Sequence, residues 1–411
     1  MNDKILKNYC ELILKVGINL YKGQCLAISC STGNIEFGLK LSETAYELGA
    51  KYVELIAYNN RLKKSRVENN TDEKDLEYIP NFSLVRSFEM ISGDWAYVRI
   101  DNLEEMDELK NIDAEKFGIM TKKELEVNSP MSAAVSNAKI PWCIVASPGP
   151  LWAAKVMNKI PSASVTDKFT DMLVKVLRLD KPDPVAEWKS LGEKLISRSK
   201  VLTEMNLDKL IFTGPGTELE VGLNKNSFWL GGPAKAANGR SFLPNIPTEE
   251  VFITPDFRRT NGKVKVTKPV KVLENSLNGI WFEFKDGKVI DFGSDNNREI
   301  LEKFVNTDEG ARSLGEVALV DKNSEVHKSG YIFNSILYDE NAACHIALGR
   351  GFPSCFVNKD ELTTPEEMNK NGCNHSLVHT DFMIGSEFIN VMGVTQDGKK
   401  VEIIKDGEFM I

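Results

Sequence analysis

The chain has 411 residues, which is too many for one ordinary hydrophobic core, so we expect two domains. Hydrophobic residues make up 42% of the chain and charged residues 27%, values close to the average for soluble globular proteins, which excludes disordered and collagen-like chains. The net charge of −8, with acidic and basic residues interspersed, provides no basic surface for a phosphate backbone, and we expect no nucleic-acid partner.

The beginning of the chain and its cysteines favour a cytoplasmic protein. Residues 1–20 (MNDKILKNYCELILKVGINL) place apolar residues at helical spacing with charged residues between them, so they lack the continuous apolar core of a signal peptide. No other stretch is long and apolar enough to span a membrane. The seven cysteines are widely spread and include no C-x-x-C pair, so we expect reduced thiols.

The first part of the chain alternates short apolar runs with amphipathic stretches. The amphipathic stretches at 35–48 and 168–177 have a helical pattern. The apolar runs read as strands at 24–30, 52–58, 96–100 and 142–147. This alternation predicts a mostly parallel sheet covered by helices, and therefore an N-terminal α/β domain over residues 1–182.

Two prolines in residues 180–184 (DKPDP) interrupt this pattern before a helical stretch at 186–202, and we place the domain boundary there. Later runs alternate apolar and polar residues and are separated by Gly, Asn and Asp, as in antiparallel hairpins; they are 218–223, 279–284 and 288–292. Residues 183–411 are therefore predicted to form a strand-rich α+β domain that contains the metal site.

Two segments of this second domain place glutamates in predicted strands. In 243–255 (LPNIPTEEVFITP), a proline-rich turn precedes Glu249 and Glu250, which face opposite ways if they lie in a strand. Only one of them is then expected to point into a site, and an exposed pair is the alternative. In 313–320 (SLGEVALV), Glu316 is the only charged residue, so it is exposed, paired or metal-bound, because an unpaired buried carboxylate costs several kcal/mol.

Two further segments contain histidines. In 339–349 (DENAACHIALG), Glu340 and His345 lie around a predicted turn that is followed by a helix or loop of small residues. In 377–385 (LVHTDFMIG), a strand places His379 and Asp381 on one face, where both can reach one cation, although an isolated pair of this kind also fits a simple hydrogen bond. Together the four segments offer only oxygen and nitrogen ligands, which favours two divalent hydrolytic metals over one structural zinc.

In this order and spacing, NIPTEEVF, LGEVALV, DENAACHIALG and HTDFMIG resemble the signature segments of the M29 family of metallo-aminopeptidases. The resemblance implies an exopeptidase that uses two divalent ions (Zn, Co, Mn or Mg) on peptides with a free N-terminus. It also implies a homodimer whose active sites face a shared interior cavity. It assigns the bridging ligand to Glu316 and the full ligand set to Glu250, Glu316, His345, His379 and Asp381.

Three residues near these ligands are candidates for catalysis and substrate binding. We expect Glu340 to be the general base, with a metal ligand as the alternative, and Glu249 to bind the substrate ammonium. The family has a tyrosine seven residues after the histidine of the third segment, where this chain has Phe352. Loss of such a hydroxyl donor typically costs about 2.7–4 kcal/mol, so activity is reduced unless another donor such as Ser354 compensates.

Two other functions are compatible with these segments. A metal-binding, peptide-binding scaffold with little turnover fits the absence of the tyrosine at Phe352. A two-metal phosphoesterase would need Arg or Lys near the phosphate, and the four segments contain few of either.

Overall fold

The computed structural model describes residues 1–70, 72–273 and 275–411. Their contacts define two compact units, which we name the N-terminal unit and the C-terminal unit. The N-terminal unit comprises Met1–Lys189 and Pro233–Ile246, and the C-terminal unit comprises Ser190–Gly232 and Pro247–Ile411. Helix α9 (Pro184–Glu204) runs from the first unit into the second, and the boundary predicted between residues 182 and 183 directly precedes it.

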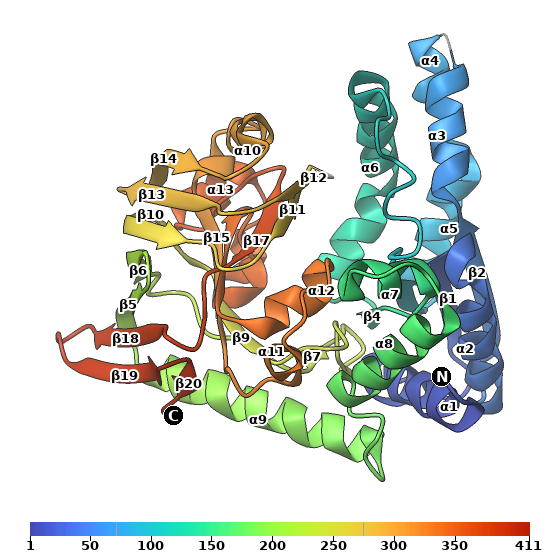
Figure 1. Ribbon diagram of the computed structural model, residues 1–411, viewed down its shortest axis with the longest axis horizontal. Helices are drawn as coiled ribbons and strands as arrows, with labels where there is room; N and C mark the ends of the chain where they lie inside the picture. The colour runs from blue at the N-terminus through green and yellow to red at the C-terminus, as the bar shows by residue number, and fades with distance from the viewer. Residues whose placement is uncertain (71, 274) are drawn as a thin grey trace. The chain divides into compact units, whose positions relative to one another are not determined.

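A four-stranded parallel sheet lies at the centre of the N-terminal unit (Figure 1). Its order is β2-β1-β3-β4, and its three pairings are all parallel. The strands are β1 (Cys25–Ser31), β2 (Tyr52–Tyr58), β3 (Ala96–Ile100) and β4 (Trp142–Val145). Parallel neighbours require crossover connections, which helices provide here, so the predicted α/β arrangement is confirmed.

Several helices of this unit begin at side chains that cap them. Asn2 accepts a hydrogen bond from the Ile5 amide at the start of α1, and Asp113 and Ser162 cap α6 and α8 in the same way. Such side chains satisfy amides that have no partner within the helix. The helices are α1 (Asp3–Leu12), α2 (Ile35–Glu47), α3 (Asn60–Asn69), α4 (Glu73–Leu76), α5 (Asn81–Ser92), α6 (Ala114–Ser136), α7 (Pro150–Met157) and α8 (Ala163–Val176).

Residues 233–246 return to the N-terminal unit after the chain has left it. They form the short hairpin of β7 (Ala234–Lys235) and β8 (Ser241–Phe242). The Ile144 amide then donates to the Pro244 carbonyl at 2.7 Å, which attaches the returning segment to β4.

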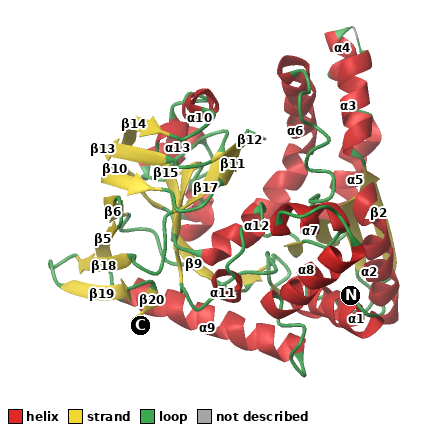
Figure 2. Cartoon of the chain, viewed as in Figure 1, coloured by secondary structure: helices red, strands yellow, loops and turns green. Residues whose placement is uncertain are grey.

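The C-terminal unit contains most of the strands (Figure 2). Its larger sheet is antiparallel, with the order β14-β13-β10-β6-β5-β18-β19-β20. Asp286 and Gly287 form the two-residue loop of the predicted hairpin with positive φ values of 49° and 83°, as a type I′ turn requires. The strands are β5 (Leu207–Gly214), β6 (Thr217–Leu223), β10 (Pro255–Lys265), β13 (Trp281–Lys285), β14 (Lys288–Gly293), β18 (Asn390–Thr395), β19 (Lys400–Lys405) and β20 (Glu408–Phe409).

The second sheet of this unit, which we name the site sheet, has the order β17-β16-β15-β9. Its strands are β9 (Glu250–Ile253), β15 (Leu314–Val320), β16 (His345–Gly349) and β17 (His379–Met383). The smaller elements around it are β11 (Val270–Val272), β12 (Asn275–Leu277), α10 (Arg298–Val305), α11 (Glu325–Ser329), α12 (Ile336–Asp339) and α13 (Pro365–Lys370). Within the described ranges, no helix combines the length and apolar character needed to cross a membrane.

Strand β16 differs from the prediction, which placed a helix or loop of small residues there. Alanine and leucine favour helices, but this segment pairs on both edges, with β15 and with β17. All of its residues are buried, so the packing and the two hydrogen-bonded edges outweigh the local preference.

Candidate metal centre

The register of the site sheet brings distant candidate ligands onto one face. Cross-strand partners in an antiparallel sheet share a face, as do residues two apart on one strand. On β16, His345 and Ala347 therefore share a face, and Ala347 pairs with Glu316 on β15 and with Asp381 on β17. Because Ala347 is small, space remains between the two carboxylates that flank it.

The other two candidate ligands reach the same face through neighbouring pairs. His379 pairs with Gly349, which lies two residues beyond Ala347 on β16. Glu250 pairs with Val320, which lies four residues beyond Glu316 on β15. The site sheet thus displays all five predicted ligands on a single face.

The side chains of these residues form two groups with one shared member. The ligand atoms of Glu250, Glu316 and His345 lie within 4.8 Å of one another, and so do those of Glu316, His379 and Asp381. Glu316 belongs to both groups. Each group offers two carboxylates and one imidazole, which is a common ligand set for zinc and similar divalent cations.

The polar atoms at the centre of these groups are not satisfied by the protein. His345 Nε2 lies 3.1 Å from Glu250 Oε2, and His379 Nε2 lies 3.2 Å from Glu316 Oε2 and 3.5 Å from Asp381 Oδ1. Even so, Glu250 Oε2 and Asp381 Oδ1 are buried and have no hydrogen-bond partner, because these contacts are not aligned as hydrogen bonds. Buried carboxylate oxygens are rarely left unpaired, so this arrangement fits bound cations.

The other ring nitrogen of each histidine faces a main-chain carbonyl. His379 Nδ1 lies 2.7 Å from the Arg350 oxygen, and His345 Nδ1 lies 3.3 Å from the Ala343 oxygen. A carbonyl oxygen can only accept a hydrogen bond, so Nδ1 holds the proton in the neutral ring. Nε2 then presents its lone pair to the carboxylate cluster, which is the tautomer that a metal ligand needs.

The ionisable groups of the site show an excess of negative charge. Burial raises the pKa of the Glu316 carboxyl, the adjacent His379 imidazole opposes that effect, and the nearby Asp381 and Glu250 carboxylates raise the pKa further. Burial lowers the pKa of His345, but the carboxylates, Glu250 first, outweigh burial and raise that pKa to about 10. The protein holds protons in this site because it lacks positive charge there, and divalent cations would provide that charge.

Glu340 lies in a buried turn directly after α12. Burial raises the pKa of its carboxyl well above the ordinary value, and the neighbouring carboxylates of Glu250 and Asp381 raise it further. Glu340 therefore lies beside the ligand cluster, although it belongs to neither group of three.

Glu249 faces away from the cluster, as expected for the strand neighbour of Glu250. Its Oε1 accepts a hydrogen bond from the Glu325 amide at 3.1 Å, at the start of α11. Of the two predicted glutamates, only Glu250 belongs to a ligand group.

Phe352 lies against one of the candidate ligands. Its ring centroid is 4.9 Å from that of His379 and 5.7 Å from that of Phe252. The position of the family tyrosine is therefore next to the cluster, and the phenylalanine ring presents no hydroxyl there. Ser354, the suggested substitute, is exposed in the following turn.

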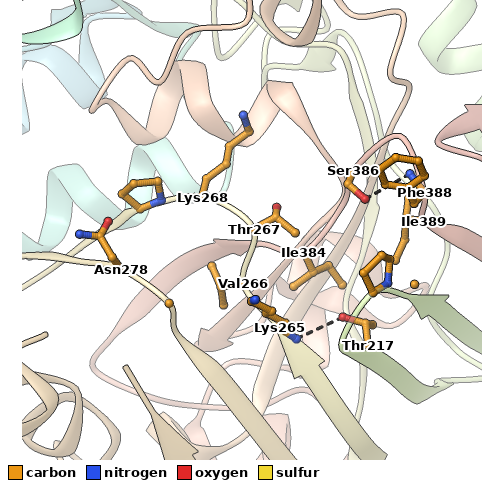
Figure 3. A pocket seen from close by; sticks show the side chains of 14 residues that line it. Thr217, Lys265, Val266, Thr267, Lys268, Asn278, Ile384, Ser386, Phe388 and Ile389 are labelled. Carbon is orange, nitrogen blue, oxygen red and sulfur yellow. Dashed lines mark hydrogen bonds between the residues drawn. The ribbon is translucent and has the colours of Figure 1, made fainter. Parts of the chain in front are cut away.

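A cavity of about 520 Å³ in the C-terminal unit contains none of the predicted site residues in its lining (Figure 3). Lys268 and Lys265 extend in different directions around it, and the Lys265 amide donates to Thr217 Oγ1 at 3.1 Å. This cavity is therefore separate from the candidate metal centre.

Sequence reasoning missed Asn341, which is fully buried beside Glu340. Its Oδ1 accepts a hydrogen bond from the Glu249 amide at 2.6 Å. The sequence did contain a signal, because Asn341 belongs to the same DENA run that drew attention to Glu340.

Comparisons with known proteins identify the family of this chain. The family described as thermophilic metalloprotease (M29) matches residues 2–409 of the chain. The chain is 35% identical over 407 residues to aminopeptidase 2 of Geobacillus stearothermophilus, and this match covers 99% of the chain and 98% of that protein. It is 32% identical over 406 residues to aminopeptidase T of Thermus aquaticus, again covering 99% and 98%.

A solved structure, wild-type AmpT from Thermus thermophilus, matches with a TM-score of 0.92 at 30% identity and covers 100% of both chains. The chain belongs to the M29 family of metalloproteases and is a metallo-aminopeptidase.

Proposed function

We propose that this M29 metallo-aminopeptidase holds two divalent cations per chain and hydrolyses the first peptide bond of short peptides with a free N-terminus. The single observation that supports two ions rather than one is that Glu316 belongs to both groups of ligand atoms. One ion would be held by Glu250, Glu316 and His345, and the other by Glu316, His379 and Asp381. When bound, such ions polarise the scissile carbonyl and favour ionisation of water.

Glu340 is the general base of this proposal. Its carboxylate takes a proton from the attacking water and passes it to the nitrogen of the leaving amine. Burial raises its pKa, the carboxylates of Glu250 and Asp381 raise it further, and cations among those carboxylates would oppose their part of the effect. Its protonation can then alternate during a catalytic cycle near neutral pH.

Phe352 forms an apolar wall beside His379, and we propose that the substrate contacts it there. Glu249 is proposed to bind the substrate ammonium. Its Oε1 already accepts a hydrogen bond from the Glu325 amide, which would compete with the ammonium for that oxygen. We retain that role as a proposal. The family resemblance supports a homodimer, and the sequence of the first 20 residues and the spread of the cysteines favour a location in the cytoplasm.

The test begins with protein that has been stripped of metal and reloaded with Zn, Co, Mn or Mg. We expect release of leucine from Leu-p-nitroanilide and from short Leu-initiated peptides, only with metal and only from peptides with a free N-terminus. N-acetylated peptides are the matched control. Equal cleavage of acetylated peptides would contradict the proposal, and the metal stoichiometry at full activity would give the number of ions.

A second candidate is the peptide-binding scaffold, which is favoured by one observation, the phenylalanine at the position of the family tyrosine. Two bound ions per chain without release of leucine under any metal would favour the scaffold over the enzyme.

A further inference from the structure

The carboxylate of Glu340 has no hydrogen bond to any described residue that would fix its direction. It is nevertheless buried, with 8% of its surface exposed, next to Glu250 and Asp381, which share its sign of charge. Because no hydrogen bond of its own holds the carboxylate there, its position depends on the backbone of its turn.

Asn341 holds that turn from the next position in the chain. Its Nδ2 donates to the Leu337 carbonyl at 2.9 Å, within α12, and to the Pro247 carbonyl at 3.3 Å. Its Oδ1 accepts from the Glu249 amide at 2.6 Å. The side chain is completely buried, and both amide hydrogens and the amide oxygen are used.

These three bonds join segments that are far apart in the sequence. The Leu337 carbonyl belongs to the helix before Glu340, whereas the Pro247 carbonyl and the Glu249 amide lie just before the start of β9. The residue after Glu249 is Glu250, a candidate ligand. One side chain thus connects the backbone of the proposed base with the backbone of a proposed ligand.

We propose that Asn341 is a positioning residue, which fixes the distance between the Glu340 and Glu250 carboxylates that the reaction requires. This inference rests on the function proposed above. Position 341 requires a side-chain amide, because its three hydrogen bonds need one acceptor and two donors. Aspartate would keep the acceptor for the Glu249 amide but would turn an oxygen toward two carbonyl oxygens.

The experiment compares Asn341→Asp and Asn341→Ala with Asn224→Ala in otherwise intact protein. Asn224 is a matched control in the same unit, since its Oδ1 accepts from the Asn226 amide at 2.9 Å and its Nδ2 donates to the Asn371 carbonyl at 2.6 Å. We expect Asn341→Asp to lower kcat about 10- to 100-fold with KM changed less than about threefold and with the wild-type number of bound ions. Asn224→Ala should leave kcat unchanged.

Hydrogen exchange on metal-free protein tests whether Asn341 acts by holding the backbone, independently of catalysis. Hydrogen exchange should become faster at the Glu249 amide in Asn341→Ala, and should remain as in wild type there in Asn224→Ala. If Asn341→Ala does not fold, the kinetics and metal content of Asn341→Asp still test the inference, because that variant keeps the acceptor for the Glu249 amide and changes only the donors.

Unchanged kcat in Asn341→Asp, or a loss explained entirely by lost metal, would overturn the inference while leaving the aminopeptidase proposal in place. A wild-type protein that releases no amino acid under any metal would overturn both.

Discussion

Two carboxylates, one in each unit, are equally buried and have opposite surroundings. Glu104 of the N-terminal unit is 9% exposed and accepts hydrogen bonds from the Leu151 and Trp152 amides, at 3.0 and 2.8 Å, at the start of α7. Glu250 of the C-terminal unit is 8% exposed, and its Oε2 has no hydrogen-bond partner. Burial of a carboxylate therefore does not by itself indicate a metal site. A buried carboxylate oxygen that has no hydrogen-bond donor and lies next to an imidazole does indicate one.

The strongest test of this comparison is a matched pair of substitutions, Glu316→Gln and Glu104→Gln. Because Glu316 belongs to both ligand groups, its loss should lower kcat about 1000-fold and reduce binding of both ions. Glu104→Gln keeps one acceptor at the helix start and should cost only about 1 kcal/mol of unfolding free energy, with kcat unchanged. Steady-state kinetics, metal analysis and urea unfolding measure these effects, and similar kcat losses in both variants would invalidate the comparison.

A second substitution tests whether Glu340 is the general base or a metal ligand. Glu340→Gln should lower kcat about 100- to 1000-fold while both ions stay bound, because Glu340 lies outside both groups of three. The readouts are kcat and metal content after gel filtration. Loss of one ion per chain would instead make Glu340 a ligand.

Asp339 is an intermediate case, since it is 3% exposed but accepts hydrogen bonds from the Phe333 and Ser335 amides. Burial still raises its pKa from 3.8 to about 6, against those hydrogen bonds. The folded state therefore binds this proton more tightly than the unfolded state does. Its contribution to stability is greatest below about pH 4 and falls by about 3 kcal/mol as the pH rises through 6.

The substitution Asp339→Asn should remove that part of the pH dependence. Urea unfolding of metal-free wild type and variant at several pH values between 4 and 7 gives the difference between the two curves. If the curves run parallel over this range, Asp339 does not titrate as its surroundings imply.

The smallest effect is expected from Phe352→Tyr, which restores a hydroxyl beside His379. The added donor should recover part of the about 2.7–4 kcal/mol that such a hydroxyl supplies, and so raise kcat by about 10-fold without changing metal content. Kinetics on Leu-p-nitroanilide would show this. An unchanged kcat would indicate that another donor already performs that function.

The sequence was sufficient for much of the site because its ligands lie in short periodic segments. A period of two placed His379 and Asp381 on one face, and the apolar run around Glu316 predicted a strand, which the structure shows to be buried along its whole length. The strand at β16 was not predictable from its alanine, leucine and glycine, because its conformation depends on partners on both edges. Local preference and tertiary pairing conflict in that segment, and tertiary pairing prevails.

The contacts that hold the site together were not predictable at all. Asn341 bonds to residues more than 90 positions earlier in the chain, at Pro247 and Glu249. The return of residues 233–246 to the N-terminal unit was not predictable either, because it depends on contacts such as the hydrogen bond between Ile144 and Pro244. Such contacts depend on the folded path of the chain, which a single sequence does not reveal.

The shared position of Glu316 has a thermodynamic consequence. If two ions use one carboxylate, the occupancy of each position changes the affinity of the other by the same factor, whichever ion binds first. A metal titration of this protein would then show two coupled binding steps, and neither measured dissociation constant would describe one position alone. The singly loaded protein would be a distinct species whose abundance is set by the coupling.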